Sequence, residues 1–176
     1  MGACSIVYRY TAPQGLILKS TALGMTGEEL HTYLSTIGEG LTKVQKDQLR
    51  RAGAQEALLL IGQFGIGLLS AFSVADKVEV FTRSCQPGSS GFKWVCEGDI
   101  HYSVEPCDKP DAGTRLVLHV TDSNLVLLEE KRLQQAIKTY ADFLSVPIYL
   151  HGNRVNSGTP PWLDEVGRSM SAVVAT

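Results

Sequence analysis

The most informative part of the chain reads Ile61-Gly62-Gln63-Phe64-Gly65-Ile66-Gly67-Leu68-Leu69-Ser70-Ala71-Phe72, with three glycines in six positions ahead of an apolar helical pattern. Glycines at such a point allow left-handed backbone angles and leave several N–H groups directed at one spot. That arrangement before a helix N-terminus suits a phosphate group. The spacing is not that of the Walker A motif, because no Lys-Ser or Lys-Thr pair follows it, and it is not the dinucleotide fingerprint. On spacing alone, the segment does not identify a ligand.

The uncharged segment around these glycines has a second interpretation. No charged residue occurs between Ala57 and Ala75, and a run of about 18 uncharged residues can span a membrane. However, Gln63, two serines and the clustered glycines are poorly suited to lipid. We therefore expect a buried helix and no membrane partner.

The composition is that of a single globular domain. The chain has 176 residues, of which 44% are hydrophobic and 19% are charged, so it can bury a sizeable core. A net charge of −2 provides no positive field for nucleic acid or anionic lipid, and we expect no nucleic-acid partner. The four cysteines form no C-x-x-C pair, so no metal site is expected and the thiols are predicted to be reduced. Together with the lack of a signal peptide, this predicts a cytoplasmic location.

The residues before the glycine segment predict a hairpin and a helix. The β-type runs Ser5 to Tyr10 and Leu16 to Lys19 are separated by a loop that contains Pro and Gly. Thr26 and Glu29 have the spacing of a capping box, and apolar residues then recur at helical spacing as far as Ile37. We expect that helix to bury one face.

The residues after it predict more strands and one further helix. The closely spaced strands indicate an antiparallel meander, and the later apolar stripe indicates a helix that lies on that sheet. We therefore expect an α/β (α+β) two-layer sandwich with a mostly antiparallel sheet. Its domain is predicted to span residues 1–162, with a linker or disordered tail over 163–176. The strands are expected at Val78–Thr82, Phe92–Cys96, Ile100–Val104, Thr114–Val120 and Val146–Leu150, and the stripe comprises Leu133, Ala136, Ile137, Tyr140, Ala141 and Leu144.

Several motifs, taken in order, resemble the N-terminal domain of the ninety-kilodalton, HtpG-like heat-shock chaperone family. Their order and approximate spacing match that family from about Ser5 to Trp162, which is far more specific than one glycine motif. The motifs are Leu23-Gly24-Met25-Thr26, Glu29-Leu30, Ser35-Thr36-Ile37, Gly62-Gln63-Phe64-Gly65-Ile66-Gly67, Ser70-Ala71-Phe72, Val74-Ala75-Asp76-Lys77-Val78, Gly113-Thr114, Leu128 to Arg132 and Val146 to Leu150.

This resemblance implies the Bergerat-type (GHKL) ATP-binding sandwich, which would lack its first helices in this chain. It implies ATP or ADP with magnesium as the cofactor, and unfolded client proteins and co-chaperones as partners. Adenine would lie between helices and sheet, and backbone amides of the glycine segment would meet the phosphates. The nucleotide-binding residues implied in this way are Ser20, Gly24, Met25, Leu34, Gly62, Gln63, Phe64, Gly65, Ile66, Gly67, Leu68 and Thr114.

The chain departs from the family pattern at the adenine contact, at the catalytic groups and in the pocket walls, where Tyr33 and Leu68 stand in place of the family's more usual small polar and aromatic residues. Ser20 stands where the family has an aspartate that accepts a hydrogen bond from the adenine amino group, and a neutral hydroxyl forms a weaker bond than a carboxylate. The family also has a catalytic Glu and a magnesium-binding Asn on a preceding helix, yet no Asp, Glu or Asn occurs before Glu28. We therefore nominate no catalytic residue and no metal ligand.

These departures leave two main expected functions, and a phosphotransfer or topoisomerase relative with the same sandwich is a third, less favoured alternative. The first is a chaperone nucleotide-binding domain, truncated at its start, that binds ATP or ADP weakly and does not hydrolyse it alone. The second is a degenerate, non-catalytic interaction module that no longer binds nucleotide. An incomplete sandwich would expose an apolar face, from which we expect homo-oligomers or aggregates. Because mitochondrial members share the motifs, the mitochondrion is the alternative location.

Overall fold

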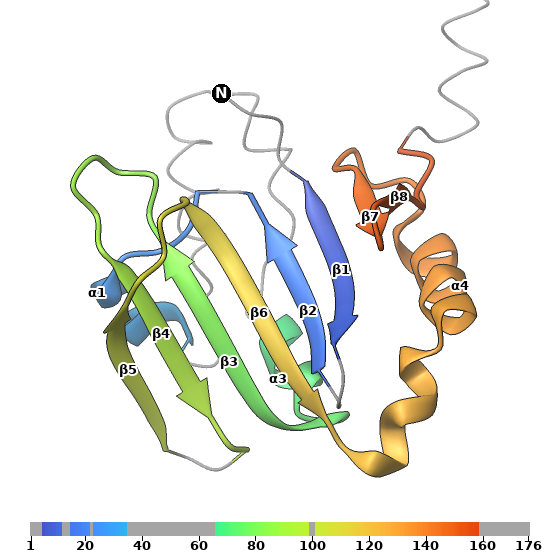
Figure 1. Ribbon diagram of the computed structural model, residues 1–176, viewed down its shortest axis with the longest axis horizontal. Helices are drawn as coiled ribbons and strands as arrows, with labels where there is room; N and C mark the ends of the chain where they lie inside the picture. Colours follow the sequence, from blue (N-terminus) through green and yellow to red (C-terminus); the bar gives the residue numbers. More distant parts are fainter. Residues whose placement is uncertain (1–4, 12–14, 22, 35–65, 99–100, 159–176) are drawn as a thin grey trace, which may run out of the picture.

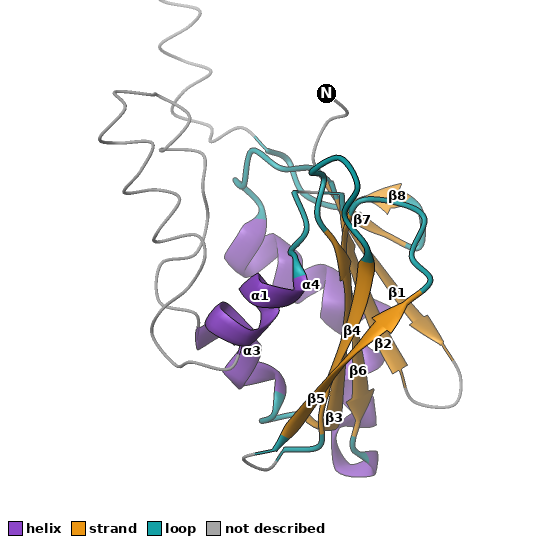
Figure 2. Cartoon of the chain, turned by 90° about the vertical axis from the view of Figure 1, so that its left-hand side faces the viewer, coloured by secondary structure: helices purple, strands orange, loops and turns teal. Residues whose placement is uncertain are grey.

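The computed structural model describes residues 5–11, 15–21, 23–34, 66–98 and 101–158. These residues form one eight-stranded mixed β-sheet, and the helices α1, α3 and α4 lie on one of its faces (Figures 1 and 2). The two-layer α+β sandwich predicted from the sequence is therefore confirmed. The residues of the proposed tail, 163–176, lie outside the described part of the chain.

The elements follow one another along the chain as short strands and helices. The strands are β1 (Ile6–Thr11), β2 (Gly15–Ser20), β3 (Ala75–Arg83), β4 (Gly91–Cys96), β5 (Tyr102–Cys107), β6 (Gly113–Val120), β7 (Ile148–Leu150) and β8 (Asn153–Arg154). The α-helices are α1 (Gly27–Glu29), α3 (Ile66–Ala71) and α4 (Glu130–Ala141), with a π-helical turn η1 (Leu30–Leu34) and a 3₁₀ helix η3 (Asp122–Leu128).

The strand order in the sheet is β5-β4-β3-β6-β2-β1-β7-β8. The predicted opening hairpin is confirmed, because β1 and β2 pair in antiparallel fashion. β1 also pairs in parallel with β7, which joins the two ends of the described chain. The prediction of a simple meander was wrong for β6, which pairs with β3 and β2 rather than with β5. β5 contains Glu105 and Pro106 and has no buried residue, so it suits the edge of the sheet, whereas the apolar β6 lies inside it.

The core lies between the helices and the sheet. Leu30 at the start of η1 is fully buried, as is Val78 on β3, while Val80 on the same strand is 2% exposed. The capping box is confirmed, since Thr26 accepts a hydrogen bond from the Glu29 N–H and the Glu29 carboxylate accepts one from the Thr26 N–H. The predicted helix differs in form, because α1 has a single turn that continues as the π-helical η1. Ile37 lies outside the described residues.

The helix α4 buries a narrower strip than its sequence pattern predicted. Ile137 is buried, but Ala136 is exposed and the side chain of Tyr140 is 86% exposed. The reason is the position of α4, which lies at the β7 end of the sheet, beyond β1, rather than over its centre (Figure 1).

η3 and β8 were not predicted from the sequence. Within the described ranges no helix is both long and apolar enough to cross a lipid bilayer.

Candidate functional site

Three hydroxyl residues form a row across the sheet on its helix-covered face. Ser20 at the end of β2 is the cross-strand partner of Thr114 on β6, and Thr114 is the partner of Thr82 on β3. Thr82 is in phase with the buried Val78 and Val80, so the row faces the helices. Such directly opposed residues have Cβ atoms about 5 Å apart, which allows their hydroxyls to interact.

Thr82 is at the centre of a small hydrogen-bond network. Its side chain is fully buried, and its Oγ1 accepts a hydrogen bond from the backbone N–H of Met25 at 2.9 Å. Thr82 Oγ1 also lies 2.9 Å from Thr114 Oγ1 and 3.4 Å from the carbonyl oxygen of Gly113. The network therefore fixes the loop after β2 against the adjacent ends of β3 and β6.

Gly24 holds the same loop close to the sheet. Its φ is +66°, in the left-handed region that favours glycine. A Cβ at this position would lie 1.9 Å from the carbonyl oxygen of Arg83 and 3.0 Å from the Gly113 nitrogen. Because both neighbours are backbone atoms of strands, no other residue fits without displacing the loop. The next residue back, Leu23, accepts a hydrogen bond from the Cys85 N–H at 2.8 Å.

Three apolar residues of the predicted site come from three separate segments of the chain. Met25, Leu34 of η1 and Leu68 of α3 all contact the buried core beneath the helices, and each remains partly exposed. The structure thus brings Gly24, Met25 and Thr114 together around Thr82, with Ser20 on the other side of Thr114. Leu34 and Leu68 contact the same core cluster as Met25.

Only the C-terminal part of the glycine segment, from Ile66 onward, is among the described residues. Ile66 begins α3, and a Cβ added to the exposed Gly67 would meet no atom within 4 Å. Gly62, Gln63, Phe64 and Gly65 lie outside the described residues. The phosphate site predicted for this segment therefore stays a prediction.

The hydroxyl pair can present two hydrogen-bonding patterns to a ligand. If Thr82 donates to Thr114, the Thr114 proton remains available for donation. If Thr114 donates to Thr82, then Thr82 donates to the Gly113 carbonyl and Thr114 presents only lone pairs. Thr114 is only partly buried and can therefore serve a polar ligand as donor or acceptor. None of these hydroxyls titrates near neutral pH, so the row suits binding and not general acid–base catalysis.

Sequence reasoning missed Thr82, although its strand was predicted. The signal was present, because Val78, Val80 and Thr82 share one face of β3 and a threonine at the third position breaks an otherwise apolar alternation. A buried hydroxyl of this kind requires hydrogen-bond partners, and here they come from a loop and a neighbouring strand.

For metals, the described residues contain no group of three or more His, Cys, Asp or Glu side chains that could hold an ion.

Comparisons with known proteins show that this chain is similar in sequence to heat-shock chaperones. Rat mitochondrial heat shock protein 75 kDa is 35% identical over 153 residues, which cover 86% of this chain and 22% of the rat protein. The chaperone protein HtpG of Chlorobium luteolum is 39% identical over 145 residues, 82% of this chain and 23% of that protein. HtpG of Myxococcus xanthus is 36% identical over 135 residues, covering 77% and 21%. This chain therefore spans under a quarter of the length of these relatives. No protein-family profile matches it.

Proposed function

Since this chain is an HtpG-like domain of the ninety-kilodalton heat-shock chaperone family, we propose that it binds the adenine nucleotide ATP or ADP between its helices and its sheet. The domain assignment, residues 1–162, forms part of this proposal. Client proteins and co-chaperones are the proposed partners of the longer chaperones that this chain resembles. The cytoplasmic location, with the mitochondrion as the alternative, stays a prediction.

The observation that carries the proposal is the Thr82–Thr114 hydroxyl pair beside the Gly24 loop. Adenine presents a ring nitrogen acceptor next to an amino donor, and Thr114 can complement either group. Gly24 lets the backbone of this loop lie against the ends of β3 and β6, next to Thr114. Leu34, Met25 and Leu68 supply the apolar surface that such a site requires. The described residues therefore fit the base end of a nucleotide.

The phosphate end rests on the family resemblance. Backbone amides of the segment 62–67 are proposed to meet the phosphates ahead of α3. Magnesium, when bound, would neutralise phosphate charge, and we assign no described residue to it. Because the row of Ser20, Thr82 and Thr114 contains no general base, we propose binding without hydrolysis by this chain alone.

Binding is proposed to be weak because of Ser20. The position lies directly across from Thr114 on the neighbouring strand, where the family resemblance places an aspartate. Losing a charge-assisted hydrogen bond of about 1.5 to 3 kcal/mol lowers affinity by about ten- to a hundredfold when nothing compensates. The same observation supports the second candidate function, an interaction module that does not bind nucleotide.

Isothermal titration calorimetry with ADP and magnesium separates the two functions. A nucleotide-binding domain gives saturable heat with the wild-type chain, and Ser20→Asp binds more tightly. Inosine diphosphate, which lacks the amino group, is the matched ligand and should gain nothing from the Ser20→Asp change. An absence of ADP binding by both proteins would support the interaction module instead.

A further inference from the structure

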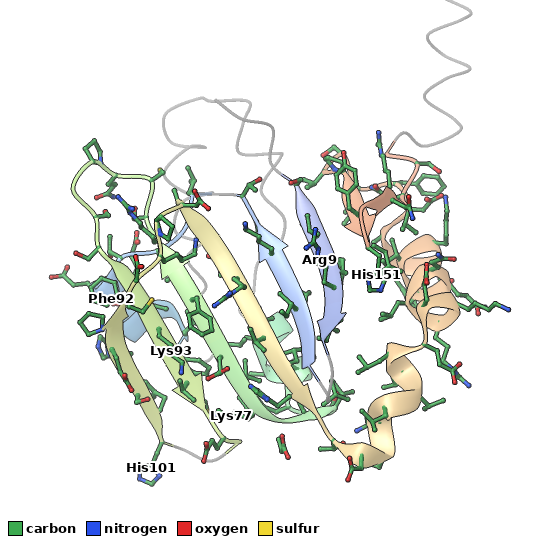
Figure 3. The ribbon with its side chains drawn as sticks, viewed as in Figure 1. Arg9, Lys77, Phe92, Lys93, His101 and His151 are labelled. Atoms are coloured by element: carbon green, nitrogen blue, oxygen red, sulfur yellow. The ribbon has the colours of Figure 1, made fainter. Side chains whose placement is uncertain are left out.

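The sheet face opposite the helices has a hollow surrounded by positive charge. Its volume is about 490 Å³, and it lies on β1, β2, β6 and β3 and beside the loop before β6. Figure 3 shows Arg9 on β1 and Lys93 on β4 projecting from this open face. Of the lining residues, the cations are Arg9, Lys19, Lys109 and Arg115, the carboxylates are Asp108 and Asp111, and the apolar ones are Val7, Ile17, Phe81 and Pro110.

The cations are crowded by the register of the sheet. Lys19 on β2 is the direct cross-strand partner of Arg115 on β6, and like charges directly opposite each other are destabilising. Within the described ranges, no carboxylate lies within 4.0 Å of the charged nitrogens of Arg9, Lys19 or Arg115. Lys93 on the neighbouring strand β4 differs from these three cations, because it forms an ion pair with Glu79 at 2.9 Å. These three cations therefore lack an ion-pair partner among the described residues and are offset only partly by Asp108 and Asp111, whereas Lys93 beside the hollow is paired.

The loop that carries the fourth cation is fixed in place. Arg83 donates to the carbonyl oxygen of Pro110 at 2.6 Å and to that of Lys109 at 3.3 Å, and Lys109 Nζ donates to the Asp111 carbonyl at 2.5 Å. Burial lowers the pKa of the Lys109 ammonium; Lys19 and Arg115 lower it further, and Asp111 opposes them. An anion in the hollow would relieve this repulsion.

The floor of the hollow favours aliphatic groups over flat bases. The Arg115 guanidinium carbon lies 4.2 Å from the centroid of the Phe81 ring, and Lys93 Nζ lies 5.5 Å from it. With cations against the ring, Phe81 is not a free platform for stacking a nucleobase. Val7 and Ile17 extend the apolar surface between the charges.

We propose that this hollow binds an extended acidic segment of a partner protein, in which carboxylates alternate with aliphatic side chains. Lys19 on β2 is directly opposite Arg115 on β6, whereas Arg9 on β1 lies two residues off that row, opposite Ile17. Because neighbouring strands lie about 4.8 Å apart, the three cations form a bent line about 12 Å from end to end. Alternate side chains of an extended peptide lie about 7 Å apart, which lets two carboxylates reach that line while aliphatic groups contact the floor. Asp108 and Asp111, which also line the hollow, would repel the closely spaced phosphates of nucleic acid more than a peptide in which only alternate residues are charged.

The test uses a fluorescent peptide of alternating Glu and Val residues, and a matched Gln–Val peptide, with binding to the whole chain followed by anisotropy. The Glu–Val peptide should bind, and its affinity should fall as salt is raised. Arg9→Gln and Lys19→Gln should each weaken binding about two- to fivefold, and the double variant about tenfold. Lys131→Gln on α4 is the control and should bind as the wild type does.

Four results would overturn the proposal. The first is equal affinity for the Gln–Val peptide, and the second is unchanged binding by both single variants, which are informative even if the double variant does not fold. The third is displacement of the peptide by a single-stranded oligonucleotide at lower concentration than by unlabelled peptide. A dimer in sedimentation that both Gln variants abolish would assign the face to a second copy and also count against an acidic partner.

Discussion

The buried hydroxyl of Thr82 accepts a hydrogen bond from the backbone N–H of Met25 at 2.9 Å, across 57 positions of sequence. This bond connects the loop after β2 to the strand that lies next to Thr114 in the sheet. The position of the Met25 loop relative to Thr114 therefore depends on Thr82, a buried residue that need not itself contact a ligand.

Thr82→Val should destabilise the fold, because it leaves the Met25 N–H without its acceptor in a largely apolar site. We expect a loss of about 1 to 3 kcal/mol in the free energy of unfolding, measured by urea denaturation. Thr82→Ser keeps the hydroxyl and should lose less than half as much. Equal losses in the two variants would mean that the methyl group, and not the hydrogen bond, is what matters.

Gly24→Ala should cost more than an ordinary surface change. A Cβ there would lie 1.9 Å from the Arg83 carbonyl oxygen, at a backbone φ of +66°. We expect a loss of at least about 2 kcal/mol, from left-handed strain and loop displacement together. Gly67→Ala is the matched control: it lies in α3 with open space around it, so it should be neutral or stabilise by up to about 1 kcal/mol. Similar urea midpoints for the two alanine variants would contradict this.

Glu79 should make stability depend on pH in the acid range. On its own, burial would raise the pKa of Glu79, but hydrogen bonds from His119 and Lys93 outweigh it and the pKa falls below its ordinary value of 4.5. A lowered carboxyl pKa contributes stability that is present above pH 4.5 and is lost as pH falls through the lower, folded-state value.

Glu79→Gln should therefore lose about 1 kcal/mol at pH 7 and flatten the decline in stability below about pH 4.5. Urea unfolding across that range gives both quantities. The control is Glu97→Gln, because Glu97 forms an exposed ion pair with Lys77 and should change stability little. An unchanged acid profile in Glu79→Gln would show that other carboxyls cause the decline.

Asn156 should be essential to the segment that begins β7. Its buried side-chain oxygen accepts from the Ile148 N–H at 2.8 Å, and its amide donates to the carbonyls of Leu144 at 2.9 Å and Val146 at 3.0 Å. Asn156→Ala leaves these backbone groups unpaired and should cost about 2 to 3 kcal/mol. The exposed Asn153→Ala, three residues earlier, should have a thermal midpoint close to that of the wild type.

The sequence predicted the strands and the capping box because those signals are local. Alternation identified β3, β4 and β6 to within a few residues, and Thr26 with Glu29 has the fixed spacing that a cap requires. Pairing is not local, so the crossing of β6 to lie between β3 and β2 was not predicted. Asn156 was missed for the same reason, because its three partners lie 8 to 12 residues earlier in the sequence and come close to it only in the folded chain.

Site prediction was limited in a similar way. Gly24, Met25 and Thr114 were identified through the family resemblance, and the structure brings them to one place. Thr82 carries no motif, so only the cross-strand register reveals its role. Tyr140 illustrates the opposite error, since a helical apolar pattern predicted burial for a side chain that α4 leaves exposed.

Calorimetric titration of ADP into the wild-type chain and into Thr114→Val tests the proposed adenine site most directly. Thr139→Val, an exposed threonine-to-valine change on α4, serves as the control. If Thr114 contacts the base, its loss should weaken ADP binding about fivefold or more while the control binds normally. Equal ADP affinity in the wild type and in Thr114→Val, with both proteins folded, would contradict the proposal that the hydroxyl row holds adenine.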